Sequence, residues 1–187
     1  MSDHDRLLSL LAERSARRGH FTLASGRQST LYIDARLTTM SPEGLALIGP
    51  LALNSLHDAA WDVAAVGGLT LGADPVSYAI AYASASTNNP LRAFTIRKEA
   101  KTHGTGRLIE GPFHEGDRVA VIEDVITTGG SALRAVDAIR AAGGSVVGVL
   151  ALVDREEGGR EALLAAGLPV LVMTRASDIL AHLTLTA

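Results

Sequence analysis

Two acidic residues beside a Thr/Gly/Ser loop are the clearest sign of chemistry in this sequence. In VAVIEDVITTGGSALRAV (residues 119–136), an apolar run ends in Glu123 and Asp124, and the loop begins at Thr127. Small residues let backbone N–H groups converge on a phosphate at the start of a helix, and Thr and Ser hydroxyls add donors. The loop can therefore hold a phosphate monoester, although the two neighbouring carboxylates should repel one.

The order of these groups along the chain indicates how acids and an anion can share one site. A ribose 5-phosphate would place its phosphate on the loop and its 2- and 3-hydroxyls on Glu123 and Asp124. The alternative is a Gly-rich strand-to-helix turn whose acids are solvated. The segment lacks the G-x-G-x-x-G of dinucleotide sites and the Lys of a nucleoside-triphosphate P-loop.

A basic segment, IRKEAKTHGTGRLIEG (residues 96–111), is the second candidate. Two glycines favour mobility. No aromatic residue lies among the charges, whereas a surface that binds single-stranded nucleic acid would normally contain aromatic residues for stacking. One interpretation is a lid that closes over a polyphosphate and excludes water. The other is a solvated surface loop. The residues that could bear positive charge are Arg97, Lys98, Lys101, His103 and Arg107.

Two further strand ends carry weaker signals. In VVGGLTLGADPVSYAI, glycines surround Thr70, and the turn could hold a pyrophosphate through backbone N–H groups or be a plain tight turn. In VDREEGG, Arg155 could grip a planar carboxylate through two hydrogen bonds, or form a surface ion pair. Asp34 is interpreted as a structural or hydrogen-bonding residue.

The elements that must position these residues alternate along the chain. Apolar strands are predicted at residues 63–68, 91–96, 118–123, 145–154 and 169–174, with a helix after most of them. This alternation predicts an α/β fold with a parallel sheet and helices on both faces. Ligands of such folds bind beyond the carboxyl ends of the strands, near a topological switch point. All four candidate segments follow predicted strands.

The N-terminal part precedes this alternation. Leu7, Leu8 and Leu11 share one face of a predicted helix that should end at Gly19. FTLASGRQSTLYID predicts two short strands around a Ser25–Gly26 turn. The helix after it should begin with Ser41 as its N-cap and Pro42 in its first position.

Composition limits the possible classes of protein. The chain has 187 residues, enough for a single domain, and it is 47% hydrophobic with a net charge of -3, so no global basic field recruits nucleic acid. It contains no cysteine, hence no thiolate nucleophile and no Cys-based zinc site. No signal peptide or membrane span is recognised, and a cytoplasmic location is expected. The remaining histidines show no metal-ligand spacing, and no Ser–His–Asp constellation can be argued.

Taken together, these segments resemble the type I phosphoribosyltransferase family and, within it, the enzymes that use orotate. VIEDVITTGGSA resembles the motif for phosphoribosyl pyrophosphate (PRPP), and RKEAKTHG followed by IEG resembles the catalytic loop of the orotate branch. FTLASGRQSTLYID resembles its N-terminal hood segment, and VVGGLTLGADP its pyrophosphate loop. The resemblance implies one phosphoribosyltransferase domain over residues 1–187. This domain would have a parallel-sheet, Rossmann-like core and a small N-terminal hood over about residues 1–40.

The resemblance also implies a reaction and roles for residues. PRPP and orotate would give orotidine 5-monophosphate and pyrophosphate, in pyrimidine biosynthesis. Mg²⁺ would be required and held mainly through PRPP and water, without a side-chain metal site. The likeness implies a homodimer in which lid residues reach the neighbouring site, and no nucleic acid or membrane partner. The 5-phosphate would contact Val125, Ile126, Thr127, Thr128, Gly129, Gly130 and Ser131, and the ribose would contact Glu123 and Asp124. The pyrophosphate would contact Arg97, Lys98, Lys101 and His103, and orotate would contact Thr127, Arg155, Tyr32 and Ile33. The catalytic residues would be Lys98, Lys101, His103 and Asp124.

The chain departs from the family pattern at two positions. Many members carry Lys where this chain has Ala24, and another Lys in the pyrophosphate loop, where this chain reads LGADP. Arg27 or the lid is expected to compensate for the missing charges. Two rival functions remain: a phosphoribosyltransferase for another base, and a regulatory protein that keeps the PRPP-binding fold and binds RNA.

Overall fold

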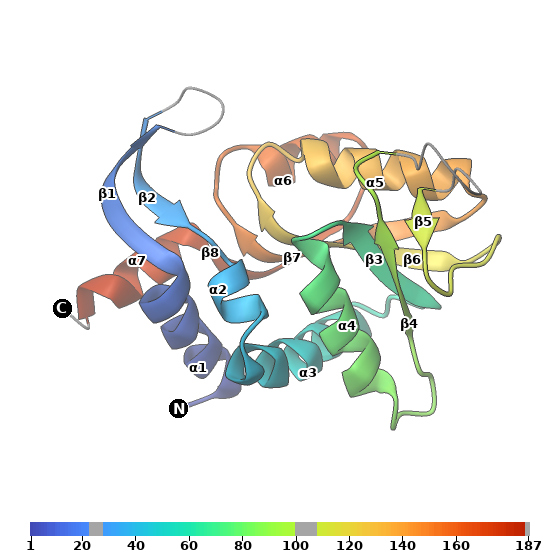
Figure 1. Cartoon of the computed structure of the whole chain (residues 1–187), viewed down its shortest axis with the longest axis horizontal. Coiled ribbons are helices and arrows are strands. Elements are labelled where there is room, and N and C mark those ends of the chain that lie inside the picture. Colours follow the sequence, from blue (N-terminus) through green and yellow to red (C-terminus); the bar gives the residue numbers. More distant parts are fainter. Residues whose placement is uncertain (23–27, 100–107, 186–187) are drawn as a thin grey trace.

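The predicted alternation produces a six-stranded sheet with the strand order β5-β4-β3-β6-β7-β8 (Figure 1). The computed structural model describes residues 1–22, 28–99 and 108–185. All strands of this sheet run parallel except β5, which pairs antiparallel with β4. The strand β5 pairs with β4 and lies in the basic segment, which the sequence predicted to be a loop. The bounds are β3 (Ala65–Leu69), β4 (Arg92–Ile96), β5 (Ile109–Glu110), β6 (Arg118–Ile126), β7 (Ser145–Asp154) and β8 (Val170–Arg175).

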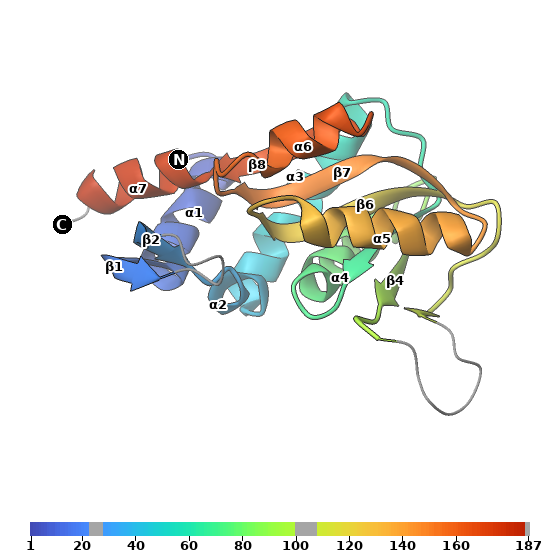
Figure 2. The same cartoon turned by 90° about the horizontal axis from the view of Figure 1, so that it is seen from above.

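Helices cover both faces of the sheet and bury two apolar clusters (Figure 2). On one face, Val136 and Leu163 pack from α5 and α6; on the other, Ile48, Ile80 and Ile179 pack from α3, α4 and α7. The α/β prediction is therefore confirmed. In the described part of the chain, no helix combines the length and apolarity needed to cross a membrane. The bounds are α1 (Asp3–Leu10), α3 (Pro42–Asp58), α4 (Ala73–Ser84), α5 (Gly130–Ala141), α6 (Gly159–Ala165) and α7 (Ala176–Leu185).

The strand order defines where a ligand should bind. From β3 the chain passes to β4 on one side, and it later returns to β6 on the other side of β3. The connections after β3 and β6 therefore diverge to opposite sides and leave room between them at the carboxyl ends of these strands. The acid pair and the predicted pyrophosphate loop both lie at this switch point.

The N-terminal segment departs from prediction in one respect. The first helix ends in a π-helical turn, η1 (Leu11–Ser15), and the chain then enters β1 (Ala16–Thr22). Gly19 thus lies inside a strand, at the irregularity where the register between β1 and β2 (Gln28–Ile33) shifts, and it does not end the helix. The two predicted strands are confirmed, while the Ser25–Gly26 turn lies outside the described residues.

The start of α3 follows its sequence signals. A short helix, α2 (Arg36–Thr39), comes first. The Ser41 hydroxyl then accepts a hydrogen bond from the Gly44 N–H at 3.1 Å, and Pro42 occupies the first helical turn. This N-cap satisfies a backbone donor that the helix leaves free.

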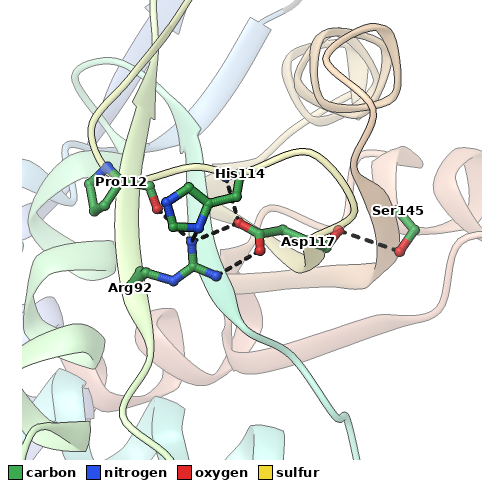
Figure 3. A network of polar contacts seen from close by, with 5 residues as sticks. All are labelled: Arg92, Pro112, His114, Asp117 and Ser145. Atoms are coloured by element: carbon green, nitrogen blue, oxygen red, sulfur yellow. Dashed lines mark hydrogen bonds and ion pairs between the residues drawn. The ribbon is translucent and has the colours of Figure 1, made fainter.

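A hydrogen-bonded network ties together the amino ends of three strands (Figure 3). Arg92, which begins β4, holds Asp117 through two charged hydrogen bonds of 2.6 and 3.0 Å. The same carboxylate accepts the His114 N–H at 2.8 Å, and the Asp117 carbonyl accepts the Ser145 N–H at the start of β7 at 2.8 Å. Arg92 also donates to the Pro112 carbonyl at 2.9 Å. This end of the sheet is therefore closed by groups that satisfy one another.

Candidate active site

A cavity of about 570 Å³ lies at the carboxyl ends of β3, β6 and β7. Its wall comes from the end of β2 and the residues after it, the β3–α4 loop, the end of β6 with the start of α5, and the residue after β7. A cavity thus lies at the switch point where the sequence predicts that a ligand binds. The predicted site residues that line it are Tyr32, Ile33, Lys98, Glu123, Asp124, Val125, Thr127, Ser131 and Arg155.

The acid pair lies within β6, because the strand continues to Ile126. Burial, and then the neighbouring Asp124, raises the pKa of Glu123 to about 8. Burial also raises the pKa of Asp124, although its carboxylate accepts the Val125 N–H at 2.9 Å. Among the described residues, the Glu123 carboxyl has neither a hydrogen-bond partner nor an ion pair. Buried acids facing a cavity in this way are typical of functional sites.

The β3–α4 loop packs directly against this pair. A methyl group on Gly72 would overlap the Asp124 carboxylate, so only glycine permits this approach. The loop is held in place by Asp74, whose carboxylate accepts the Thr70 hydroxyl at 2.7 Å and the Thr95 hydroxyl at 2.8 Å. The loop predicted to carry pyrophosphate therefore borders the acid pair.

The loop after β6 has the geometry expected from its glycines. Gly129 adopts a left-handed conformation with φ of 82°, which side chains other than glycine rarely adopt. Val125, Thr127 and Ser131 line the cavity, while Ile126 is 1% exposed and belongs to the core, so only its backbone can face a ligand. Thr128, Gly129 and Gly130 complete the turn without lining the cavity.

Arg155 follows β7 and is buried, with 9% of its surface exposed. Its Nη2 atom lies 2.9 Å from a carboxylate oxygen of Glu157 and donates to the Leu31 carbonyl at 3.2 Å. Leu31 belongs to β2, so the guanidinium connects the sheet to the N-terminal strands. Arg155 does form an ion pair, as the alternative expected, but the pair is buried and holds the guanidinium at the cavity wall.

The chain is similar over nearly its whole length to orotate phosphoribosyltransferases from several bacteria. It is 46% identical to the orotate phosphoribosyltransferase of Aquifex aeolicus over 183 residues, covering 96% of this chain and 99% of the relative. It is 47% identical to that of Sorangium cellulosum over 181 residues, covering 96% and 94%. No protein-family model matches the chain. The chain belongs to the orotate phosphoribosyltransferase family.

A solved structure of the orotate phosphoribosyltransferase family supports the same placement. The Mycobacterium tuberculosis H37Rv enzyme in complex with 5-phospho-alpha-D-ribosyl 1-diphosphate superposes with a TM-score of 0.80. The two chains are 42% identical, and the match covers 95% of this chain and 99% of the other. The fold predicted from the sequence is thus that of the family.

The basic segment of this family member is described in part. Lys98 lines the cavity, whereas Arg97 is absent from its wall and pairs with Glu110 of β5 at 3.0 Å. Arg97 therefore anchors the start of the segment to the sheet edge. Lys101 and His103, like Ala24 and Arg27, lie outside the described residues.

Sequence reasoning missed two arginines in the cavity wall. Arg134 lies in α5, one turn after Ser131, and Arg36 begins α2, beside the predicted hood residues. Helical spacing after the loop could have indicated Arg134. Arg36 gave no such signal, because its position depends on how β2 meets the sheet. Asp34 has the predicted hydrogen-bonding role, accepting Arg36 Nε at 2.8 Å and Nη2 at 2.9 Å.

The donor chemistry of the cavity fits Mg²⁺ in one specific way. Within the described residues, no cluster of three or more His, Asp or Glu side chains could hold a metal ion. Mg²⁺ is usually bound by one or two carboxylates together with substrate phosphates and water. Asp124 supplies a carboxylate of that kind, so a phosphorylated substrate would have to complete the coordination.

Proposed function

We propose that the chain transfers the 5-phosphoribosyl group from PRPP to N1 of orotate, giving orotidine 5-monophosphate and pyrophosphate. The observation that carries this proposal is the single cavity in which the acid pair, the Thr/Gly/Ser loop, Lys98 and Arg155 meet. Membership of the orotate phosphoribosyltransferase family supports the substrate class.

The cavity offers a place for each part of the two substrates. The 5-phosphate would lie on the loop between Thr127 and Ser131, with the ribose over the acid pair. The pyrophosphate would extend toward the β3–α4 loop and Lys98. Orotate would place its carboxylate on Arg155 and its ring against the hood residues Tyr32 and Ile33.

The acids differ in what they contribute to the reaction. Departure of pyrophosphate makes the sugar oxocarbenium-like, as in glycosyl transfer generally. A buried Glu123 with a pKa of about 8 is largely protonated at neutral pH, so it can hold a ribose hydroxyl without repelling a phosphate. Asp124 is then the member of the pair that carries negative charge toward the developing cation. This division answers the apparent conflict between acids and anion in the sequence.

Mg²⁺ would be held mainly by PRPP and water, with the Asp124 carboxylate within the same cavity, and when bound it would offset the charge of the pyrophosphate. The basic segment would close over the substrates and exclude water, which prevents hydrolysis of PRPP. Replacing Lys101 by Ala should therefore lower turnover far more than it weakens orotate binding. Near wild-type turnover in that variant would contradict the lid hypothesis.

The reaction can be tested directly through the ultraviolet absorbance of orotate. Absorbance should fall only when the protein, PRPP and Mg²⁺ are all present. Loss of absorbance with another base in place of orotate would favour the first rival function. Silence with orotate, combined with RNA binding in a shift assay, would favour the regulatory protein.

The role of Arg155 can be tested against a shape-matched change. Arg155→Met removes the guanidinium but keeps an apolar stem, and it should raise the KM for orotate about 30-fold, the effect of losing a charge-assisted pair. The KM for PRPP should change much less. An equal rise in both KM values would mean that Arg155 supports the fold of the cavity rather than orotate.

We also propose that two copies of the chain form a homodimer through α2 and α4. Leu37, Met40 and Leu71 line a shallow hollow next to the active-site cavity, each at least half exposed. Tyr78 and Tyr82, one turn apart on α4, are 52% and 86% exposed. Exposed apolar groups gathered beside a site fit a second copy that brings its lid across. A cytoplasmic location stays a prediction from the sequence.

The dimer has a matched pair of test variants. Tyr82→Arg should yield monomers in analytical ultracentrifugation, whereas Leu164→Arg, on the helix α6, should not. Leu164 is 45% exposed and belongs to the opposite face of the sheet. If both variants sediment like the wild type, the α2–α4 surface is not the interface. Recovery of activity on mixing Lys101→Ala with Asp124→Asn would support lid action across the dimer.

A further inference from the structure

The part of the cavity that would receive pyrophosphate is short of positive charge. The β3–α4 loop and the start of α4, residues 69–75, contain no Lys or Arg and one acid, Asp74. Asp124 lies directly against Gly72 of the same loop. A leaving group that gathers negative charge here would meet two carboxylates, so a cation must come from another element.

Arg36 is a cation on that side of the cavity. It lines the cavity together with residues 69–72, and it also shares the neighbouring apolar hollow with Leu71. Arg36 also lowers the pKa of Asp124 through its charge, which places it within electrostatic reach of the acid pair. Arg134, by contrast, lies one turn after Ser131, at the end of the cavity that would hold the 5-phosphate. Its charge acts to lower the pKa of Glu123.

The guanidinium of Arg36 is held in one orientation and keeps a donor group available. Asp34 accepts from Nε at 2.8 Å and from Nη2 at 2.9 Å, and it also accepts the Arg36 backbone N–H at 3.2 Å. Within the described part of the chain, the Nη1 group makes no hydrogen bond. A guanidinium fixed on one edge by a carboxylate presents its other edge to an incoming anion, at little further cost in side-chain entropy.

We propose that Arg36 binds the pyrophosphate of PRPP and of the product, with Asp34 orienting its guanidinium. This inference rests on the proposed function and names a residue that supplies, from α2, the charge that the β3–α4 loop lacks. The ligand class is a pyrophosphate group, and the proposal assigns Arg36 no contact with the sugar or its 5-phosphate.

Three ligands separate the two ends of the site. Binding of PRPP, inorganic pyrophosphate and ribose 5-phosphate would be measured by calorimetry in the presence of Mg²⁺. Arg36→Gln should weaken PRPP and pyrophosphate about tenfold, the size of one charge-assisted hydrogen bond, and leave ribose 5-phosphate within about twofold. Arg134→Gln should show the opposite pattern, weakening PRPP and ribose 5-phosphate but not pyrophosphate.

A control variant and the stability of the fold complete the test. Arg14 pairs with Glu43 at 2.9 Å outside the cavity, so Arg14→Gln removes a comparable ion pair and should change none of the three affinities. Unchanged melting temperature and oligomeric state in Arg36→Gln would show that the loss is local.

The outcomes distinguish this inference from the function on which it rests. Unchanged pyrophosphate binding in Arg36→Gln, or equal weakening of all three ligands, would overturn the role of Arg36 while orotate conversion by the wild type stands. A wild-type protein that neither binds PRPP nor converts orotate would overturn the proposed function itself. Selective loss of the two pyrophosphate ligands supports the inference.

Discussion

The two ends of the central sheet treat their buried acids in opposite ways. At the amino end, burial would raise the pKa of Asp117, but the hydrogen bonds from Arg92 and the His114 N–H outweigh it and hold that pKa below its usual value. At the carboxyl end, burial goes uncompensated and raises the pKa of Glu123 to about 8. Both acids are at most 9% exposed, but Glu123 lies deeper in the protein than Asp117, so the difference reflects both their depth and their partners.

This contrast separates a structural acid from a functional one. Asp117 receives its positive charge and donors from the chain itself, so its interactions are complete in the folded protein. Glu123 faces a cavity, and its partners would arrive with a substrate. A group left unsatisfied by its own fold costs stability, and such groups are retained where binding or catalysis uses them.

The largest expected effect tests the charged member of the carboxyl-end pair. Asp124→Asn keeps the shape of the side chain but removes the charge that faces the developing cation. Turnover of orotate should fall by about a hundredfold or more, in the range seen when one preorganised electrostatic group is lost. Steady-state kinetics at pH 7, with saturating PRPP and Mg²⁺, would measure this loss.

Glu123→Gln is the matched comparison within the same pair. Because Glu123 is largely protonated at pH 7, an amide there resembles the native group, and turnover should fall by about tenfold at most. Equal losses in the two variants would show that both acids work as carboxylates, and the division of roles between them would be wrong.

A second test applies the same logic to the amino end. Asp117→Asn removes one charge from a buried, bidentate pair and leaves Arg92 partly uncompensated. We expect a loss of about 2 kcal/mol in the free energy of unfolding, with turnover per folded molecule unchanged. Denaturant titration and kinetics on the same preparation would measure both. A large fall in turnover at unchanged stability would contradict the assignment of this network to structure.

The comparison also shows what local sequence can and cannot predict. The strand, the acid pair and the Thr/Gly/Ser loop are contiguous, so residue types and spacing were enough to predict their arrangement around Gly129. The alternation of strands and helices predicted a parallel sheet, whereas the order of its strands is known only from the structure. The sequence also did not predict that β6 extends through Asp124, because the end of a strand depends on its pairing, here with β7.

Residues that act through tertiary contacts were beyond the reach of such patterns. Arg36 enters the cavity wall because β2 delivers α2 to the end of the sheet, a placement that no spacing within YIDAR encodes. The bond from Arg155 to the Leu31 carbonyl joins positions 124 residues apart. The Arg92–Asp117 pair likewise connects two strands whose sequence neighbours gave no reason to link them.

The last expected effect is a pH dependence of stability that arises at the carboxyl end. The pKa of Glu123 is about 8 in the folded chain, against an ordinary value of 4.5. Between these values the folded state keeps a proton that the unfolded chain releases, so stability should fall as pH rises through this window. Glu123→Gln cannot titrate, so its melting temperature should exceed that of the wild type by an amount that grows by roughly 10 °C from pH 5 to pH 8.

The amino end supplies the internal standard for this last measurement. Because the pKa of Asp117 is lowered, its contribution to stability is complete above the ordinary value of 3.8 and is lost only as pH falls below it. Asp117 therefore adds no slope between pH 5 and pH 8, and Asp124, which titrates with a raised pKa, is present in both proteins. Calorimetry across this range should give melting temperatures that diverge with pH. Parallel curves would mean that Glu123 is ionised in the folded chain, and the contrast between the two ends of the sheet would then fail.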